Sequence, residues 1–114
     1  MIILGLDPGT AATGFGIVAF DSGHLRLESC GVWRPAARFT LPEKLEFLFT
    51  SAAELLGRVT PAAVSVETVF AAKNISSALK LAHARGVLLA AAARASVPVF
   101  EYEPRLVKKA LVGY

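Results

Sequence analysis

Residues 2–20, IILGLDPGTAATGFGIVAF, decide the fold, because they hold two apolar runs joined by a short turn. The first run, residues 2–6, is almost continuously apolar, which is typical of a buried strand. Asp7-Pro8-Gly9 then interrupts it with residues that favour a turn, and residues 14–20 form the second run. The segment therefore predicts two neighbouring strands, with Asp7 at the end of the first.

The rest of the chain continues this pattern with a third strand and then alternates helices with strands. Asp21-Ser22-Gly23 is a hairpin-type turn, and residues 24–33 alternate apolar and polar side chains in their first half. The further elements that we expect are a helix capped by Thr40 and Glu43 and stopped at Gly57, a strand over 62–67, a helix capped by Asn74 or Ser76 and running to about residue 95, a strand over 97–102 and a helix over 105–111. This order predicts one α/β domain over residues 1–114, built on a mixed sheet flanked by helices.

Composition sets limits on the class of protein. The formal net charge of +3 leans toward an anionic partner, although ordinary surface composition explains so small an excess equally well. Cys30 has no second cysteine to pair with, which agrees with a reducing compartment. The start of the chain lacks the basic region of a signal peptide, and the apolar stretch 86–93 is far shorter than the roughly 20 residues of a membrane span. We therefore expect a cytoplasmic protein that does not enter a membrane.

Two acidic residues, Asp7 and Glu67, each end an apolar run that contains no other charge. Ligands of α/β sheets gather at the carboxyl ends of strands, and carboxylate oxygens are natural ligands of Mg²⁺ or Mn²⁺. If the two strands are neighbours, both carboxylates reach one metal site. An acid at a strand end can equally be a solvated cap, and the spacing alone supports both interpretations.

The turn after Asp7 reads Asp-Pro-Gly-Thr, and Gly9 permits a tight turn with a positive φ there. Its backbone N–H groups and the Thr10 hydroxyl would suit a phosphate, whereas a plain turn explains the same residues. The DPGT string also occurs in actin-like ATPases, which gives a rival interpretation. That interpretation requires a second phosphate loop and an adenosine pocket, and the sequence contains no sign of either.

Three strings together resemble the RuvC family of Holliday junction resolvases: IILGLDPGTAATGFG at residues 2–16, VETVFAAKNISSALKLAHARGV at residues 66–87 and VPVFEYEPRLVKKALVG at residues 97–113. They occur in the family's order and cover nearly the whole chain. The resemblance implies an RNase H-like fold with a five-stranded mixed sheet, in which the strands at 62–67 and 97–102 run parallel to the first. It also implies a homodimer that nicks four-way DNA junctions with two Mg²⁺ or Mn²⁺ ions per site and cooperates with the RuvA–RuvB branch-migration complex.

Carried over residue by residue, the resemblance makes Asp7 and Glu67 catalytic metal ligands. Phe70 matches an aromatic residue that wedges into the junction, and Lys108 matches a basic residue near the active site. An aromatic ring can stack on an unpaired base, although a lone Phe more often joins the core.

A helix start near residue 74 adds further candidates for DNA contact. Lys73, Asn74 and Ser76 suit a phosphate at this start, whereas an ordinary helix cap explains the same residues. The helix that follows carries small residues at four-residue spacing, which either meet a second copy or pack on its own sheet: Ala78, Ala82, Gly86 and Ala90.

The family's two other acidic metal ligands lie in a helix beyond Tyr114, and the family's C-terminal helices are therefore missing from this chain. We consequently expect the 114-residue form to cut poorly, because half of the ligand set holds Mg²⁺ weakly. A fragment that binds junctions or dimerises without cutting is the alternative function, and an actin-like ATPase fragment is a more distant one.

Overall fold

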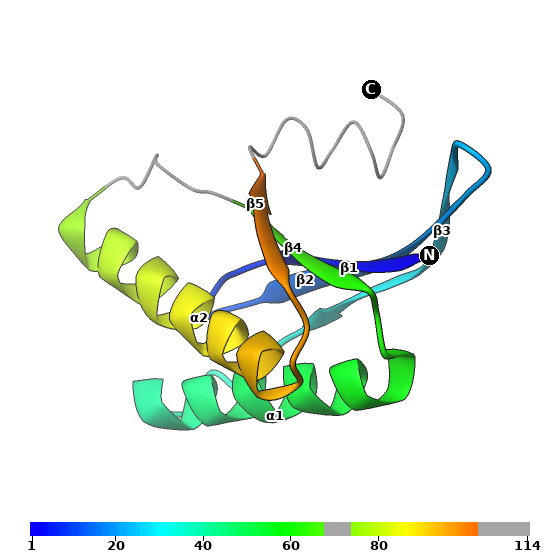
Figure 1. Cartoon of the computed structure of the whole chain (residues 1–114). Helices are drawn as coiled ribbons and strands as arrows, with labels where there is room; N and C mark the ends of the chain where they lie inside the picture. The colour runs from blue at the N-terminus through cyan, green and yellow to red at the C-terminus, as the bar shows by residue number, and fades with distance from the viewer. Residues whose placement is uncertain (68–73, 103–114) are drawn as a thin grey trace.

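The computed structural model of the chain describes residues 1–67 and 74–102, which form a five-stranded sheet and two long helices (Figure 1). The elements are β1 (Ile2–Asp7), β2 (Thr13–Asp21), β3 (His24–Trp33), α1 (Leu41–Val59), β4 (Ala63–Glu67), α2 (Ile75–Arg94) and β5 (Val99–Tyr102). This order confirms the expected succession of three strands followed by alternating helices and strands. The helix expected over 105–111 lies outside the described residues.

The strands lie in the order β3-β2-β1-β4-β5, so β1 is at the centre of the sheet. β1 pairs antiparallel with β2, and β2 pairs antiparallel with β3. On its other edge β1 pairs parallel with β4, which in turn pairs parallel with β5. The expected mixed sheet is therefore confirmed. Its parallel neighbours β1 and β4 come from distant parts of the chain.

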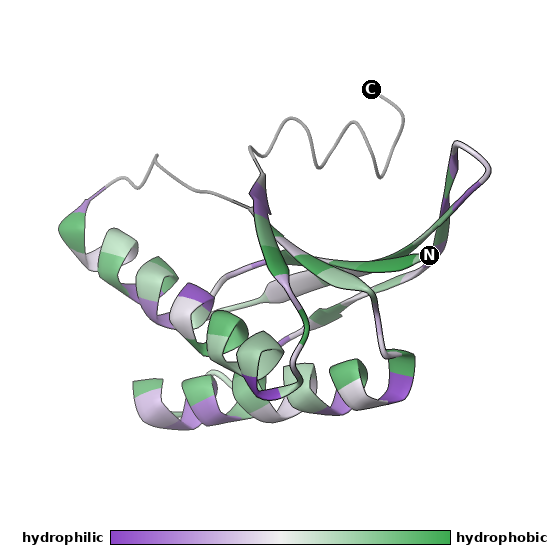
Figure 2. Ribbon diagram, viewed as in Figure 1, coloured by the Kyte–Doolittle hydropathy of each residue, from purple (hydrophilic) through white to green (hydrophobic). Residues whose placement is uncertain are grey.

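One face of the sheet packs against both helices, which lie on the same side of it in Figure 1. Because side chains alternate along a strand, Leu4 and Leu6 of β1 point to this face, and each is at most 3% exposed. Together with β4 and the helices they form one hydrophobic core, and Figure 2 shows the apolar stretches of these elements. The core residues are Leu4, Leu6, Ala52, Leu55, Leu56, Val64, Val66, Leu88, Ala91 and Ala92.

The start of α1 is the expected capping box. The Thr40 N–H donates to the Glu43 carboxylate at 2.8 Å, and the Glu43 N–H donates to the Thr40 hydroxyl at 3.3 Å. The bond from the Thr40 backbone, helped by the Thr40 hydroxyl, lowers the pKa of the Glu43 carboxyl.

The expected stop at Gly57 is wrong, because α1 continues to Val59. Thr60 ends it in a left-handed conformation (φ 47°), and the proline that follows disfavours further helix.

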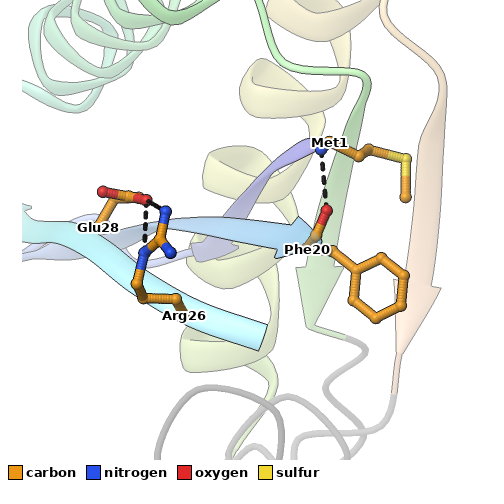
Figure 3. A network of polar contacts seen from close by, with 4 residues as sticks. All are labelled: Met1, Phe20, Arg26 and Glu28. Carbon is orange, nitrogen blue, oxygen red and sulfur yellow. Dashed lines mark hydrogen bonds and ion pairs between the residues drawn. The ribbon is translucent and has the colours of Figure 1, made fainter. Parts of the chain in front are cut away.

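The β2–β3 hairpin closes through Ser22 and Gly23, which have positive φ angles of 52° and 79°. The register between β2 and β3 shifts at a β-bulge: Ile17 pairs with Ser29, whereas the next residue, Val18, pairs with Leu27. Near this bulge the Arg26 guanidinium contacts the Glu28 carboxylate at 2.6 Å (Figure 3). The chain's amino group donates to the Phe20 carbonyl at 2.9 Å and so ties the start of β1 to the end of β2.

Candidate active site at the carboxyl ends of β1 and β4

Asp7 is the last residue of β1, and Glu67 is the last residue of β4. The parallel register pairs Leu6 with Val66, and its continuation by one residue brings the backbone of Glu67 beside that of Asp7. The expectation that the two acids end adjacent strands is therefore confirmed. The Asp7 side chain is exposed.

Asp7 points to the face of the sheet opposite α1 and α2, because it alternates with the buried Leu6. The β2 residue paired with Asp7 is Gly14, and the next residue of β2 on this face is Gly16. A Cβ built at Gly14 would already lie 3.7 Å from the Asp7 Cβ. Because both positions are glycines, β2 places no side chain beside Asp7 on this face.

The donor set available here suits Mg²⁺ or Mn²⁺ in its chemistry. Both residues supply carboxylate oxygens, and Mg²⁺ in proteins commonly uses one or two carboxylates and retains several waters. Within residues 1–67 and 74–102, no group of three or more His, Cys, Asp or Glu side chains gathers as a further metal centre. The described part of the site is thus the exposed Asp7 at the end of β1, beside the last residue of β4.

The turn after Asp7 does not use the positive φ that a glycine permits. Among the described glycines, Gly23 has a positive φ and Gly9 does not. Gly9 is required instead by close approach, since a Cβ at this position would lie 2.3 Å from the Ala12 carbonyl oxygen. The turn therefore excludes a side chain at residue 9 for a steric reason that the residue types alone did not indicate.

The candidates for DNA contact divide into two groups. Asn74 is the N-cap of α2, and its side-chain oxygen accepts from the Ser77 N–H at 2.8 Å, so the ordinary cap interpretation describes its bonding. Ser76 is exposed in the first turn of this helix, which begins on the side toward which β1 and β4 run (Figure 1). Phe70, Lys73 and Lys108 lie outside the described residues.

The small-residue stripe of α2 faces solvent. Ala78, Ala82, Gly86 and Ala90 are all exposed, whereas the buried side of the helix carries Ala84, Leu88, Ala91 and Ala92. The interpretation that the stripe packs on the chain's own sheet is therefore wrong. The helix buries its other side because the larger Leu88 removes more apolar surface from water than an alanine does.

One structural residue of this region, Thr13, was not identified from the sequence. Thr13 is fully buried and bonds to the backbone of Gly9. The alternation of Thr13, Phe15 and Ile17 along β2 could have indicated it, because the first member shares the face of the other two. A hydroxyl on an inward face requires a hydrogen-bond partner.

The family model for crossover junction endodeoxyribonuclease RuvC matches residues 3–114. The chain belongs to the RuvC family. A RuvC of Solidesulfovibrio magneticus is 52% identical over 98% of this chain and 66% of its own length. A RuvC of Chloroflexus aurantiacus is 45% identical over 100% of this chain and 70% of its own length. The chain thus spans about two thirds of the length of these RuvC relatives.

The solved structures agree with this membership. Thermus thermophilus RuvC in complex with a Holliday junction substrate superimposes with a TM-score of 0.86 and is 34% identical. The match covers 98% of this chain and 70% of that protein. It confirms the expected RNase H-like architecture. Within residues 1–67 and 74–102, no helix is both long and apolar enough to cross a bilayer.

Proposed function

We propose that this RuvC-family chain forms the first part of an endonuclease that resolves Holliday junctions in DNA recombination and repair. The observation that carries the proposal is the adjacency of Asp7 and Glu67 at the ends of two parallel central strands. The Thermus thermophilus relative, which is bound to a junction, supplies the substrate class. The reaction is hydrolysis of a phosphodiester, made symmetrically on two strands by two copies of the chain.

Asp7 and Glu67 would hold Mg²⁺ or Mn²⁺ in this proposal, with two ions per site in the complete protein. The bound ions supply Lewis-acid stabilisation of the attacked phosphate and of the leaving 3′ oxygen. The chain's own part is to present both carboxylates from one edge of a rigid sheet. The side-chain-free β2 positions beside Asp7 allow the DNA backbone to approach the site.

The DNA is expected to follow the chain from Glu67 into α2. Phe70 would stack on an unpaired base near the cut, which is worth ~1–3 kcal/mol. Lys73 and Lys108 would neutralise phosphates, and Ser76 would donate from the exposed first turn of α2. Asn74 would act through the helix start that it caps.

A second copy of the chain would meet the exposed face of α2 and form the homodimer. Ile75 and Leu79 are 79% and 57% exposed on this helix, next to the exposed small residues. Small residues let a second helix approach closely, and the apolar side chains lose solvent contact when it does. Cooperation with the RuvA–RuvB complex and a cytoplasmic location belong to the same proposal.

A second candidate function is junction binding or dimerisation without cutting. It is favoured by the absence of a group of three or more metal-binding side chains among the described residues. The actin-like ATPase interpretation remains a more distant alternative, and calorimetry with ATP tests it directly, because an ATPase fragment would release heat on binding.

The experiment incubates the 114-residue chain with a synthetic four-way junction and with linear duplex, in Mg²⁺ or Mn²⁺. We expect preferential binding of the junction and nicking that is slow beside that of Thermus thermophilus RuvC. Asp7→Asn should abolish the nicking, whereas Asp21→Asn, the same change in an exposed residue at the other end of the sheet, should not. Binding without nicking in either ion would favour the second candidate, and nicking that survives Asp7→Asn would overturn the proposed metal site.

A further inference from the structure

A short connection joins the proposed metal ligand Asp7 to the first residue of β2, Thr13. Thr13 is fully buried, and its hydroxyl donates to the Gly9 carbonyl at 2.7 Å. The same oxygen accepts from the Gly9 N–H at 3.2 Å. One side chain therefore satisfies both backbone polar groups of the residue two positions after Asp7.

The connection between β1 and β2 is also tightly packed within itself. The carbonyl of Ala12 lies so near Gly9 that any Cβ there would collide with it. Pro8 is buried between Asp7 and Gly9 and has a fixed φ. The hydroxyl of Thr13, the bare Gly9 and the rigid Pro8 therefore allow the connection very little freedom.

In the described part of the chain, the contacts that place Asp7 are those of its backbone. Among the described residues, no hydrogen bond or ion pair reaches the Asp7 carboxylate, and its side chain is exposed. The strand ladder holds Asp7 through its pairing with Gly14. Beyond Asp7 the ladder stops, and after the rigid Pro8 the next hydrogen-bonded residue along the chain is Gly9.

We infer that Thr13 is a positioning residue of the proposed metal site: its hydroxyl locks Gly9 and thereby fixes the direction in which Asp7 presents its carboxylate. The inference rests on the proposed function of Asp7. A ligand held in place before the ion arrives loses less conformational freedom on binding, and partners that orient a metal ligand affect affinity strongly. Thr13 acts only through the backbone and does not touch the ion.

The test compares Thr13→Val, which keeps the shape but removes the hydroxyl, with Thr13→Ser, which keeps the hydroxyl. Thr50→Val is the matched control, because Thr50 is exposed on α1. Mn²⁺ is titrated into the isotopically labelled 114-residue chain, and the broadening of the Asp7 and Gly14 amide signals gives the apparent affinity. Hydrogen exchange of the Gly9 amide gives the state of the connection independently of the ion.

Thr13→Val should weaken Mn²⁺ binding about tenfold and should remove the exchange protection of the Gly9 amide. Thr13→Ser and Thr50→Val should match the unaltered chain in both measurements. Unchanged Mn²⁺ affinity in a folded Thr13→Val, with the Asp7→Asn variant unable to bind, would overturn the role of Thr13 and leave the proposed site standing. Should Thr13→Val fail to fold, a Thr13→Ser chain that binds Mn²⁺ about tenfold more weakly while keeping its Gly9 protection would also contradict the inference.

Failure of the proposed function gives a different pattern. In that case the unaltered chain and Asp7→Asn would show the same Mn²⁺ response, whether both bind or neither does. The inference would then fall together with the metal site, while exchange at Gly9 would still report whether the Thr13 hydroxyl holds the connection.

Discussion

The two faces of the sheet both carry apolar side chains, but these side chains differ in their exposure to solvent. On the helix-covered face, Leu4, Leu6, Val64 and Val66 are each at most 3% exposed. On the open face, Leu25 and Leu27 are both 46% exposed, and Phe100 is 51% exposed. The register places Leu27 on the open face, since it pairs with Val18 and Val18 pairs with Ile3, which alternates with Leu4. The exposed residues of this face lie on the edge strands β3 and β5, whereas Val18 on β2 is 5% exposed.

The difference teaches that hydrophobic side chains on a sheet do not by themselves create a core. Helices α1 and α2 remove one face from water, and the open face leaves apolar residues of β3 and β5 exposed. Apolar patches that remain exposed mark surfaces on which another group docks. The RuvC relatives extend beyond the length matched by this chain, and the open face is the part of the described sheet with apolar surface left to bury.

The largest expected effect compares one leucine from each face. Leu4→Ala should lower the free energy of unfolding by about 2–5 kcal/mol, because it leaves a cavity in a packed core. Leu27→Ala should lower it by less than about 1 kcal/mol, because that side chain is half exposed. Urea denaturation followed by circular dichroism measures both, and equal losses would contradict the distinction between the faces.

A second expected effect concerns association of the chain with itself through the open face. The unaltered chain should self-associate in sedimentation velocity as its concentration rises. Leu27→Lys should weaken that association about tenfold, which corresponds to about 1.4 kcal/mol. Leu79→Lys on α2 is the comparison, because Leu79 is exposed on the surface proposed for the homodimer. An effect of Leu79→Lys alone would place all association on α2.

A third, smaller effect belongs to the helix that covers the packed face. Thr40→Ala should destabilise the chain by about 1 kcal/mol, because it removes the hydroxyl that accepts from the Glu43 N–H at the start of α1. Thr40→Ser keeps this acceptor and should be nearly neutral. Thermal unfolding of both variants measures the difference, and an equal shift for Ser and Ala would show that the cap contributes nothing.

The smallest expected effect is a pH dependence from Glu43. The Thr40 hydrogen bonds lower the pKa of this carboxyl below its ordinary value of 4.5, so the folded chain favours the charged form. Its contribution to stability is therefore present above pH 4.5 and is lost as the pH falls through the lower folded pKa. Glu43→Gln should flatten the acid limb of the stability curve slightly, and an unchanged limb would contradict the assignment.

The sequence predicted best where local chemistry decides the structure. The capping box at Thr40 and the cap of α2 depend on neighbouring residues. The box was found as expected, and Asn74 is the one of the two candidate caps, Asn74 and Ser76, that the structure selects. The predicted helix end at Gly57 was wrong, because a glycine in an exposed helix position lowers helix stability by about 1 kcal/mol without necessarily ending the helix.

Features that depend on tertiary packing were harder to predict. The spacing of the small residues did not determine which side of α2 is exposed. The hydrogen bonds between the Thr13 hydroxyl and the Gly9 backbone depend on how the connection between β1 and β2 folds. The strand-end rule placed Asp7 and Glu67 at carboxyl ends, but it does not say which strands are neighbours, and their adjacency was an expectation only with the resemblance to the RuvC family. The proposed roles of Phe70, Lys73 and Lys108 stay predictions.

The parallel pairing of β1 with β4 also sets the order in which the molecule can assemble. β1, β2 and β3 are joined by short connections and can pair soon after they are made, whereas β1 must wait for two further strands and all of α1 before β4 reaches it. Contacts between residues so far apart along the chain form slowly, because a long loop must close first. On a translating ribosome, Asp7 therefore spends a period beside an unfilled strand position, and the carboxylate pair comes into existence only after residue 67 has emerged. The proposed metal site is thus unavailable to the nascent chain until the centre of its sheet is complete.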